Sequence, residues 1–440
     1  MRVALISFHT FFQPGGVKRH ILGLYKELKK RRISVKIIAP RRSQKENYGK
    51  DVILLGTSFP LHFSGGTADL DINFNPLAIE ETLKKERFNV LHCHNFGFPS
   101  VLQILLSPSA SDTLNILTCH FNIKGSKFLK KFPIFLYLLI KICQWKIDGV
   151  IGVAPLNLDS FKHYKGPKIV IPNGTDLEVF NPKVARLKKF NDGKTNILFL
   201  GRIEERKGLI YLLKAYKILQ NKFSNLRLIV CGDGPLKKDL ENWVATNKLK
   251  DVVFEGKTEE NKAPFYYRTC DIYCSPAIFG ESFGLVLVEA MACGKPVVAF
   301  SNDGYRGVLT GKGARFLAKP RDYKTLAKKL ELLIKSKKLR KEMGEWGIRE
   351  SKKYSWQKVA DQILNFYQFC RREKQKKEIK KSPSLEKLLN KISTGDISKW
   401  LKKLKFDKMI NKVYNKNALN RRAKGVSLNK KRLTIFIKCF

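Results

Sequence analysis

The sequence predicts an α/β protein with two doubly wound parallel sheets, and three observations support this. Short β-branched, apolar runs alternate with amphipathic helical stretches. The runs are mostly apolar throughout, as expected for parallel strands that are covered on both faces. The alternation stops at residues 172–194, which are rich in Pro, Gly, Asn and Asp, and then starts again. We therefore expect two domains with a cleft between them, joined by this linker.

The first domain is predicted from five strand candidates and one clear helix. The helix, at residues 17–31, places Ile21, Leu24 and Leu28 at helical spacing, with Lys and Arg on its other face. Strand–helix–strand repetition of this kind predicts right-handed crossovers in a parallel sheet. The strands are expected at Val3–Ser7, Val35–Ala39, Val90–Cys93, Ile116–Cys119 and Gly149–Val153.

The second domain repeats the same pattern. A helix is predicted from Leu285 to Cys293, because Gly294 and Pro296 follow it directly as a C-terminal stop. The strands are expected at Ile197–Leu200, Leu228–Val230, Val252–Phe254, Ile272–Cys274 and Val297–Phe300.

Composition excludes several classes of protein. The 440 residues suggest two or three domains, and a hydrophobic share of 43% provides sizeable cores, so wholesale disorder is excluded. No apolar run reaches the roughly 18 residues of a membrane-spanning helix. The N-terminus starts a strand-like run and lacks the layout of a signal peptide, so we expect a cytoplasmic protein. Nine scattered cysteines argue against a disulfide framework.

The charge points to anionic partners. Lys plus Arg is 85 against 38 Asp plus Glu, a net charge of +47, which favours nucleotides, nucleic acid or an anionic membrane. The basicity is densest in residues 371–440, with 23 Lys or Arg against 5 Asp or Glu. There Ile397, Trp400, Leu401 and Leu404 recur at helical spacing, which predicts a basic amphipathic helix on anionic lipid. A disordered tail or an RNA-binding tail would have the same composition.

Two glycine-containing loops are candidate phosphate sites. Gly15 and Gly16 lie between the first strand and the first helix, where free N–H groups and the helix dipole suit a phosphate. A full G-x-G-x-x-G is absent, so a simple tight turn is the competing interpretation. In the loop 201–208, Arg202 and Lys207 follow a strand end, and this pair of cations would suit a diphosphate. A solvated basic loop is the alternative.

The segment 280–296 is the most informative. The helix within it is apolar on every face except at Glu289, and a buried unpaired carboxylate is costly. The partners of Glu289 would be ribose hydroxyls or, alternatively, an internal arginine. Glu281 precedes the helix in a Gly-flanked loop, where it could instead be a helix-start acid. The N–H groups of Phe283, Gly284 and Leu285 are placed to face phosphate oxygens.

These motifs resemble the family 4 glycosyltransferases. The shared features are the E-x7-E spacing of Glu281 and Glu289, the Gly-Arg…Lys-Gly loop at 201–208, the Gly15-Gly16 loop and the Ile-Pro-Asn-Gly-Thr-Asp segment at 171–176, over about residues 1–370. Residues 13–20, 280–292 and 305–309 are most similar to the phosphatidylinositol mannosyltransferases. The resemblance implies the GT-B fold, two Rossmann-like domains with a nucleotide-sugar in the cleft, retention of anomeric configuration, and no metal or cofactor.

The resemblance also implies domain limits. These are an acceptor-side domain at 1–172, a linker at 173–193, a nucleotide-sugar domain at 194–352, a helix at 353–370 that crosses back to the first domain, and a basic tail at 371–440.

The resemblance further implies residue roles. Arg202 and Lys207 would neutralise the leaving diphosphate, and Gly16 would donate a backbone N–H to it. Glu289 would hold the ribose, and Glu281 would contact the sugar hydroxyls near the reacting carbon. His120, at a strand end, would bond the 6-hydroxyl of the sugar. Negative charge that builds on a departing nucleoside diphosphate is stabilised by fixed cations and helix-end N–H groups, which agrees with these roles.

Other polar residues are open to more than one interpretation. His92, Cys93 and His94 near Cys119 and His120 could suggest zinc, but adjacent residues on a strand face opposite ways, so polar lining of the strand ends is favoured. His9 and His20 are expected on the acceptor side of the cleft. The mixed cationic and aromatic segment 124–132 is either a membrane-facing loop or a solvated loop over the core.

The sequence thus predicts a metal-independent retaining glycosyltransferase. It would transfer a hexose, mannose from GDP-mannose, to a lipid-linked or membrane acceptor such as phosphatidylinositol, at the cytoplasmic face of the membrane. A UDP-sugar enzyme that acts on a polysaccharide or a soluble acceptor is the runner-up, and a GT-B epimerase is a weaker candidate. A nucleic-acid-binding protein is the rival from another class. It is disfavoured because DNA binding needs no Glu289 inside an apolar helix.

Overall fold

The computed structural model describes residues 1–11, 15–43, 45–63, 66–95, 99–120, 137, 141–142 and 144–381, without the side chains of 60–70 and 379–381. Both sheets lie in the unit Met1–Glu373. Among the helices of the described part, none has the length and apolar character needed to cross a bilayer. The amphipathic helix predicted around residues 397–404 and the segment 124–132 lie outside the described residues.

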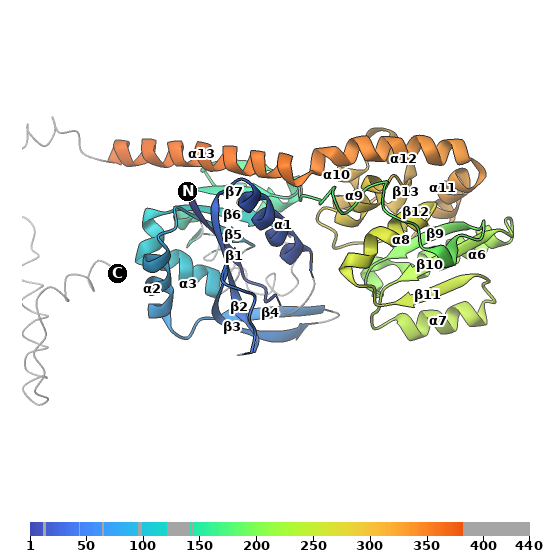
Figure 1. Cartoon of the computed structure of the whole chain (residues 1–440), viewed down its shortest axis with the longest axis horizontal. Helices are drawn as coiled ribbons and strands as arrows, with labels where there is room; N and C mark the ends of the chain where they lie inside the picture. Colours follow the sequence, from blue (N-terminus) through green and yellow to red (C-terminus); the bar gives the residue numbers. More distant parts are fainter. Residues whose placement is uncertain are drawn as a thin grey trace, which may run out of the picture. The chain divides into compact units, whose positions relative to one another are not determined.

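The N-terminal lobe is built on an eight-stranded sheet in the order β4-β3-β2-β1-β5-β6-β7-β8 (Figure 1). All neighbouring strands are parallel except β3 and β4, which form an antiparallel pair. Its elements are β1 (Arg2–Ser7), α1 (Gly16–Lys30), β2 (Ser34–Arg41), β3 (Val52–Phe63), β4 (Gly66–Ile72), α2 (Pro76–Glu86), β5 (Val90–His94), α3 (Ser100–Leu106), β6 (Leu114–Cys119), β7 (Gly149–Gly152) and β8 (Lys168–Val170).

The five strands predicted for this lobe are present, but the sheet is wider than predicted. Strands β3, β4 and β8 were missed. Gly56, with φ +90°, and Pro60 interrupt the apolar run of β3 in the way that usually marks a turn. Strand β4 has aspartates at alternate positions after Gly66 and Thr67, and β8 has only three residues, so neither gives a clear apolar signal.

The C-terminal lobe has a fully parallel six-stranded sheet in the order β11-β10-β9-β12-β13-β14. This is the 3-2-1-4-5-6 order of a doubly wound dinucleotide-type fold. Its strands are β9 (Thr195–Leu200), β10 (Leu226–Cys231), β11 (Val252–Gly256), β12 (Ile272–Ser275), β13 (Val297–Phe300) and β14 (Leu317–Ala318). Its helices are α6 (Leu209–Gln220), α7 (Lys237–Thr246), α8 (Ala263–Thr269), α9 (Leu285–Ala292), α10 (Asp303–Val308), α11 (Tyr323–Lys335) and α12 (Lys337–Ser351).

Helices cover both faces of each sheet, which confirms the predicted doubly wound class. In the N-terminal lobe, α2 and α3 pack on one face, whereas α1 and α13 (Trp356–Lys381) pack on the other. Helix α13 follows the C-terminal lobe in sequence and runs back along the N-terminal lobe near α1 (Figure 1). Its Ile363, Phe366 and Tyr367 belong to the same buried cluster as Leu24 of α1. It continues to Lys381, beyond the predicted end at residue 370.

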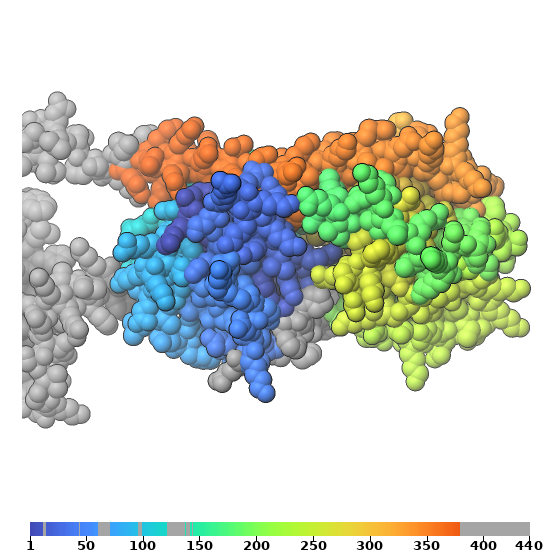
Figure 2. Space-filling view, in the orientation of Figure 1, coloured from blue at the N-terminus to red at the C-terminus, as the bar shows by residue number. Residues whose placement is uncertain are grey.

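Residues 171–194, which the structure describes in full, connect the two sheets without a strand of their own. The segment begins in the N-terminal core, where Ile171 is buried, and its later residues pack on the C-terminal lobe (green in Figure 2). Phe180 joins the buried cluster around α9, and the Arg186 guanidinium donates to the carbonyl oxygen of Thr269 at 2.9 Å.

Strand order fixes where a ligand can bind. In each sheet the winding reverses beside the first strand, between β1 and β5 and between β9 and β12. In open α/β sheets, ligands bind beyond the carboxyl ends of the strands at such reversals. The loops that leave these four strands carry Gly15 and Gly16, the residues after His94, the segment 201–208 and the segment 276–284.

Candidate active site

Three helices begin with glycine at these reversals. Gly15 precedes α1 in an extended conformation, while Gly208 before α6 and Gly284 before α9 have φ values of +67° and +108°. Within the described residues, no side chain caps the N-terminus of any of the three. The first-turn N–H groups of a helix have no partner within the helix, so these ends are suited to anions. The predicted donors Gly16, Phe283 and Leu285 lie at two of them.

A charge cluster joins the loop after β9 to the loop after β12. The Lys207 ammonium donates to Glu281 Oε1 at 2.6 Å, and Arg206 Nη1 approaches the same oxygen at 3.1 Å. The side chains of Lys207 and Glu281 are only 15% and 14% exposed. The structure therefore brings together two of the predicted site residues, which lie 74 positions apart in the chain, and adds Arg206.

Arg202 lies in the same network but is placed differently. Its side chain is 57% exposed, and its Nε lies 3.4 Å from Glu204 Oε2. The other oxygen of Glu204 lies 2.5 Å from Arg206 Nε. Glu204 thus links the two arginines. Arg202 remains the more accessible cation, while Lys207 is held against Glu281.

Close backbone contacts fix the two loops. A Cβ on Gly208 would lie 2.1 Å from the carbonyl oxygen of Pro276, so only glycine permits this approach. The N–H of Ile278 donates to the carbonyl of Arg206 at 2.8 Å, and the N–H of Gly304 donates to the carbonyl of Glu281 at 3.1 Å. The position of Glu281 is therefore set by the backbone on both sides.

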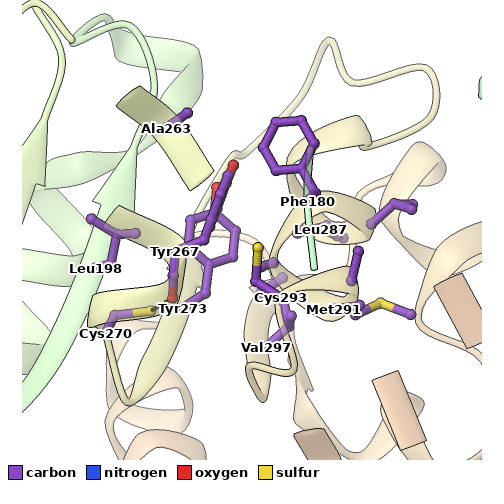
Figure 3. Close-up of a cluster of buried hydrophobic side chains, with 14 of the residues drawn as sticks. Phe180, Leu198, Ala263, Tyr267, Cys270, Tyr273, Leu287, Met291, Cys293 and Val297 are labelled. Carbon is purple, nitrogen blue, oxygen red and sulfur yellow. Dashed lines mark hydrogen bonds between the residues drawn. The ribbon is translucent and has the colours of Figure 1, made fainter. Parts of the chain in front are cut away.

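Glu289 is buried on α9 and has two protein partners. Its Oε1 accepts from Arg19 Nη1 at 2.6 Å, and its Oε2 accepts from the Tyr267 hydroxyl at 3.0 Å. Figure 3 shows Tyr267 and Tyr273 close to each other in the apolar core of the C-terminal lobe, which also contains the α9 residue Leu287. The prediction that this carboxylate needs a partner holds. Of the two partners expected, the arginine is the one present, and the ribose role stays a prediction.

Three histidines converge in the N-terminal lobe. His94 Nδ1 lies 3.2 Å from His120 Nε2, and the His20 ring lies 5.2 Å and 4.6 Å from these two rings, centroid to centroid. Burial lowers the pKa of His20 to about 4 and the pKa values of His94 and His120 well below the usual value. All three are therefore neutral at pH 7. His9, by contrast, is partly exposed.

This arrangement bears on the zinc interpretation. His92 and His94 lie on one face of β5, with rings stacked at 4.3 Å, whereas Cys93 and Cys119 lie in the core on the other face. Strand alternation thus separates the cysteines from the histidines. The ligand atoms of His20, His94 and His120 lie within 4.8 Å of one another, the one group with metal-binding potential among the described residues. His20 is only 2% exposed, and its place on the acceptor side of the cleft stays a prediction.

Sequence reasoning missed three residues at the site. These are Arg19, Arg206 and Tyr267. Arg206 stands in a motif that was recognised, yet nothing in the sequence distinguishes it from its neighbouring cations. A buried Glu289 predicts a cationic partner, but any of the 85 Lys and Arg residues could have been that partner, so the sequence does not single out Arg19. Tyr267 lies in a short helix with no motif.

Two doubly wound lobes that present glycine-capped helices and cations at their winding reversals define the GT-B class of glycosyltransferases. The structure aligns with sucrose-phosphate synthase from Thermosynechococcus elongatus with a TM-score of 0.66, covering 83% of this chain and 98% of that one at 20% identity. It aligns with Anabaena HepE, solved in complex with UDP, with a TM-score of 0.63, covering 83% and 99% at 16% identity.

The chain belongs to glycosyltransferase family 4. The family described as Glycosyltransferase Family 4 matches residues 14–179, and the one described as Glycosyl transferases group 1 matches residues 182–350. A phosphatidyl-myo-inositol mannosyltransferase of Mycobacterium leprae is 32% identical over 375 residues, covering 84% of this chain and 96% of that protein. The protein is thus a retaining hexosyltransferase, and enzymes of this family use nucleotide-sugar donors.

Proposed function

We propose that the enzyme transfers mannose from GDP-mannose, without a metal, to a membrane-associated acceptor such as phosphatidylinositol at the cytoplasmic face of the membrane. The observation that carries this proposal is the Lys207–Glu281 pair beside Arg202 and Arg206, at the winding reversal where a diphosphate would lie. The relatives named as phosphatidyl-myo-inositol mannosyltransferases, 32% identical, support the choice of sugar and acceptor.

The cations and helix ends stabilise the leaving group. Negative charge builds on the nucleoside diphosphate as the glycosidic bond breaks. Arg202 and Lys207 neutralise this charge, with Arg206 beside them. The N-termini of α1 and α9 add backbone N–H groups, from Gly16 and from Phe283 to Leu285. These groups are held in place before the donor arrives, so they need little reorganisation in the transition state.

The remaining residues position the donor. Glu281 contacts hydroxyls of the sugar, and Glu289 holds the ribose. His120 is neutral at pH 7, so its imidazole bonds the 6-hydroxyl without placing a positive charge near an oxocarbenium-like centre. The incoming acceptor hydroxyl loses its proton to the leaving phosphate on the same face of the sugar. This route keeps the anomeric configuration and needs no strong protein base.

A UDP-sugar donor with a polysaccharide or soluble acceptor is the second candidate. One observation favours it, because the structural neighbour from Anabaena was solved with UDP. The site contacts that the protein offers, to ribose, diphosphate and sugar, are shared by both nucleotides. The base therefore has to be identified by experiment.

A panel of nucleotide-sugars tests the proposal. In the presence of EDTA, GDP-mannose is expected to raise the melting temperature of the enzyme by more than UDP-glucose or UDP-GlcNAc does. The enzyme should also hydrolyse GDP-mannose slowly, and faster than it hydrolyses either UDP-sugar. Lys207→Met should abolish most of the shift, whereas Lys262→Met, which removes a lysine with a 62% exposed side chain elsewhere in the same lobe, should not. Preference for a UDP-sugar would select the second candidate.

Two other results would contradict the proposal itself. A strict need for a divalent ion would overturn the metal-free mechanism. Steeply salt-dependent binding of RNA without any nucleotide-sugar turnover would overturn the enzyme proposal.

A separate assay tests the membrane acceptor. Phosphatidylinositol-containing liposomes should sediment the full-length enzyme, and a variant that ends at Lys381 should bind them less while it still hydrolyses the donor. Unchanged liposome binding by the shortened chain would remove the role of the basic tail.

A further inference from the structure

One ion pair connects the two lobes directly at the site. Arg19 lies in the first turns of α1, three residues after Gly16, and its Nη1 lies 2.6 Å from Glu289 Oε1 on α9. The Arg19 side chain is 35% exposed, whereas that of Glu289 is 5% exposed. The guanidinium therefore covers the carboxylate from the accessible side.

The second partner of Glu289, the Tyr267 hydroxyl, is harder for a ligand to displace. Tyr267 is fully buried, and its ring packs against Tyr273 at 5.1 Å and Phe180 at 6.0 Å, centroid to centroid. Its hydroxyl holds Oε2 from within the C-terminal lobe. A ligand that reaches Glu289 must therefore take the place of Arg19, which has a long side chain and partial exposure.

We infer that Arg19 and the donor ribose compete for Glu289, so that the Arg19–Glu289 pair is a latch between the lobes that donor binding releases. The inference rests on the proposed role of Glu289 in holding the ribose. Ribose hydroxyls donate hydrogen bonds to Oε1 just as the guanidinium does, so the carboxylate is satisfied in both states and is never left buried without a partner. Arg19 is thus a positioning residue that sets how readily the site accepts the nucleotide.

The latch lowers the apparent affinity for the nucleotide. A ligand that binds only the unlatched form has its affinity reduced by the fraction of molecules in that form. If the pair is formed in about 70 to 90% of donor-free molecules, its removal should tighten nucleotide binding roughly three- to tenfold.

Calorimetry with GDP and UDP tests this. We expect Arg19→Gln to bind the preferred nucleotide roughly three- to tenfold more tightly than wild type. Arg19→Lys, which can re-form the pair, should stay near wild type, and Glu289→Gln should bind more weakly. In the Glu289→Gln background, Arg19→Gln should have no further effect. Lys26→Gln removes an exposed cation from the same helix and should leave the dissociation constant unchanged.

The outcomes separate the two proposals. If Arg19→Gln binds no more tightly than wild type, or if Lys26→Gln tightens binding equally, while Glu289→Gln is impaired, the latch is wrong and the ribose role stands. If Glu289→Gln binds as wild type does, or if wild type binds neither nucleotide, the ribose role itself is wrong and the latch falls with it. Tighter binding by Arg19→Gln that persists in the Glu289→Gln background would also overturn the latch.

Discussion

Replacing Gly208 with alanine should disable the active site through the backbone alone. Gly208 has φ +67°, and a Cβ built on it would lie 2.1 Å from the carbonyl oxygen of Pro276, where an ordinary contact begins at 3.4 Å. The loops after β9 and β12 must separate to admit the methyl group. The hydrogen bond from the Ile278 N–H to the Arg206 carbonyl normally holds the two loops together. Separation of the loops would therefore break this bond and carry Arg206 and Lys207 away from Glu281.

The cost of Gly208→Ala has two parts. A left-handed conformation disfavours alanine by about 1–2 kcal/mol. Overpacking against a rigid backbone adds about 1–3 kcal/mol. Gly193→Ala is the matched control, because Gly193 has φ +84° and no atom within 4 Å of its added Cβ. Both variants carry the cost of placing alanine in a left-handed conformation. The difference between their free energies of unfolding therefore isolates the steric cost, for which we expect about 2 kcal/mol.

Urea denaturation and nucleotide titration together test this reasoning. Gly208→Ala should unfold at a lower urea concentration than Gly193→Ala, and it alone should lose nucleotide affinity. Equal stability and equal affinity in the two variants would show that the loops separate freely, and that the close approach of Gly208 to Pro276 does not hold Lys207 on Glu281.

Two further predictions concern the buried polar groups of the N-terminal lobe. Burial lowers the pKa of His20 to about 4 in the folded chain, so the unfolded chain binds a proton first as the pH falls. The free energy of unfolding should be highest above about pH 6.5 and should decrease towards pH 4, with a loss on the order of 1 kcal/mol from His20 at pH 5.5, and unchanged urea midpoints at pH 7.5 and 5.5 would contradict this. Tyr367→Phe removes the 2.6 Å bond to His92 Nδ1 and should cost about 1–3 kcal/mol of unfolding free energy, against little for Tyr323→Phe on a partly exposed side chain.

The central strands could be predicted from the sequence, and the edge strands could not. A strand such as β1 or β13 is buried on both faces, so its apolar run is unbroken and its signal is strong. Strand β14 has two residues, and β4 is a hairpin partner at the sheet edge with polar alternation. Strand β4 pairs with β3, its neighbour in the sequence, and β14 pairs with β13 across a helix-containing segment. Neither strand carries an apolar run of its own, so pairing determines them and local pattern does not.

The candidate site shows the same contrast between local features, which the sequence predicts, and tertiary contacts, which it does not. The glycine before α9 and the spacing of Glu281 and Glu289 are local features, and they could be predicted. Which cation meets which carboxylate depends on how two loops from different strands pack. The turn at residues 205–207 directs Arg206 and Lys207 towards Glu281 and leaves Arg202 to Glu204. The Arg19–Glu289 pair depends further on how one lobe meets the other.

The pairing of charges should keep the site from binding polyanions that carry phosphates alone, although the net charge is +47. Four cations at the site, Arg19, Arg202, Arg206 and Lys207, face the three carboxylates Glu204, Glu281 and Glu289. A polyanion that offers phosphates alone would take the cations and leave buried carboxylates without partners, which is costly. A nucleotide-sugar offers phosphates to the cations and hydroxyls to the carboxylates at the same time. The alternation of opposite charges therefore selects a ligand that carries both, whereas the basic surface elsewhere exerts only a long-range attraction that salt screens.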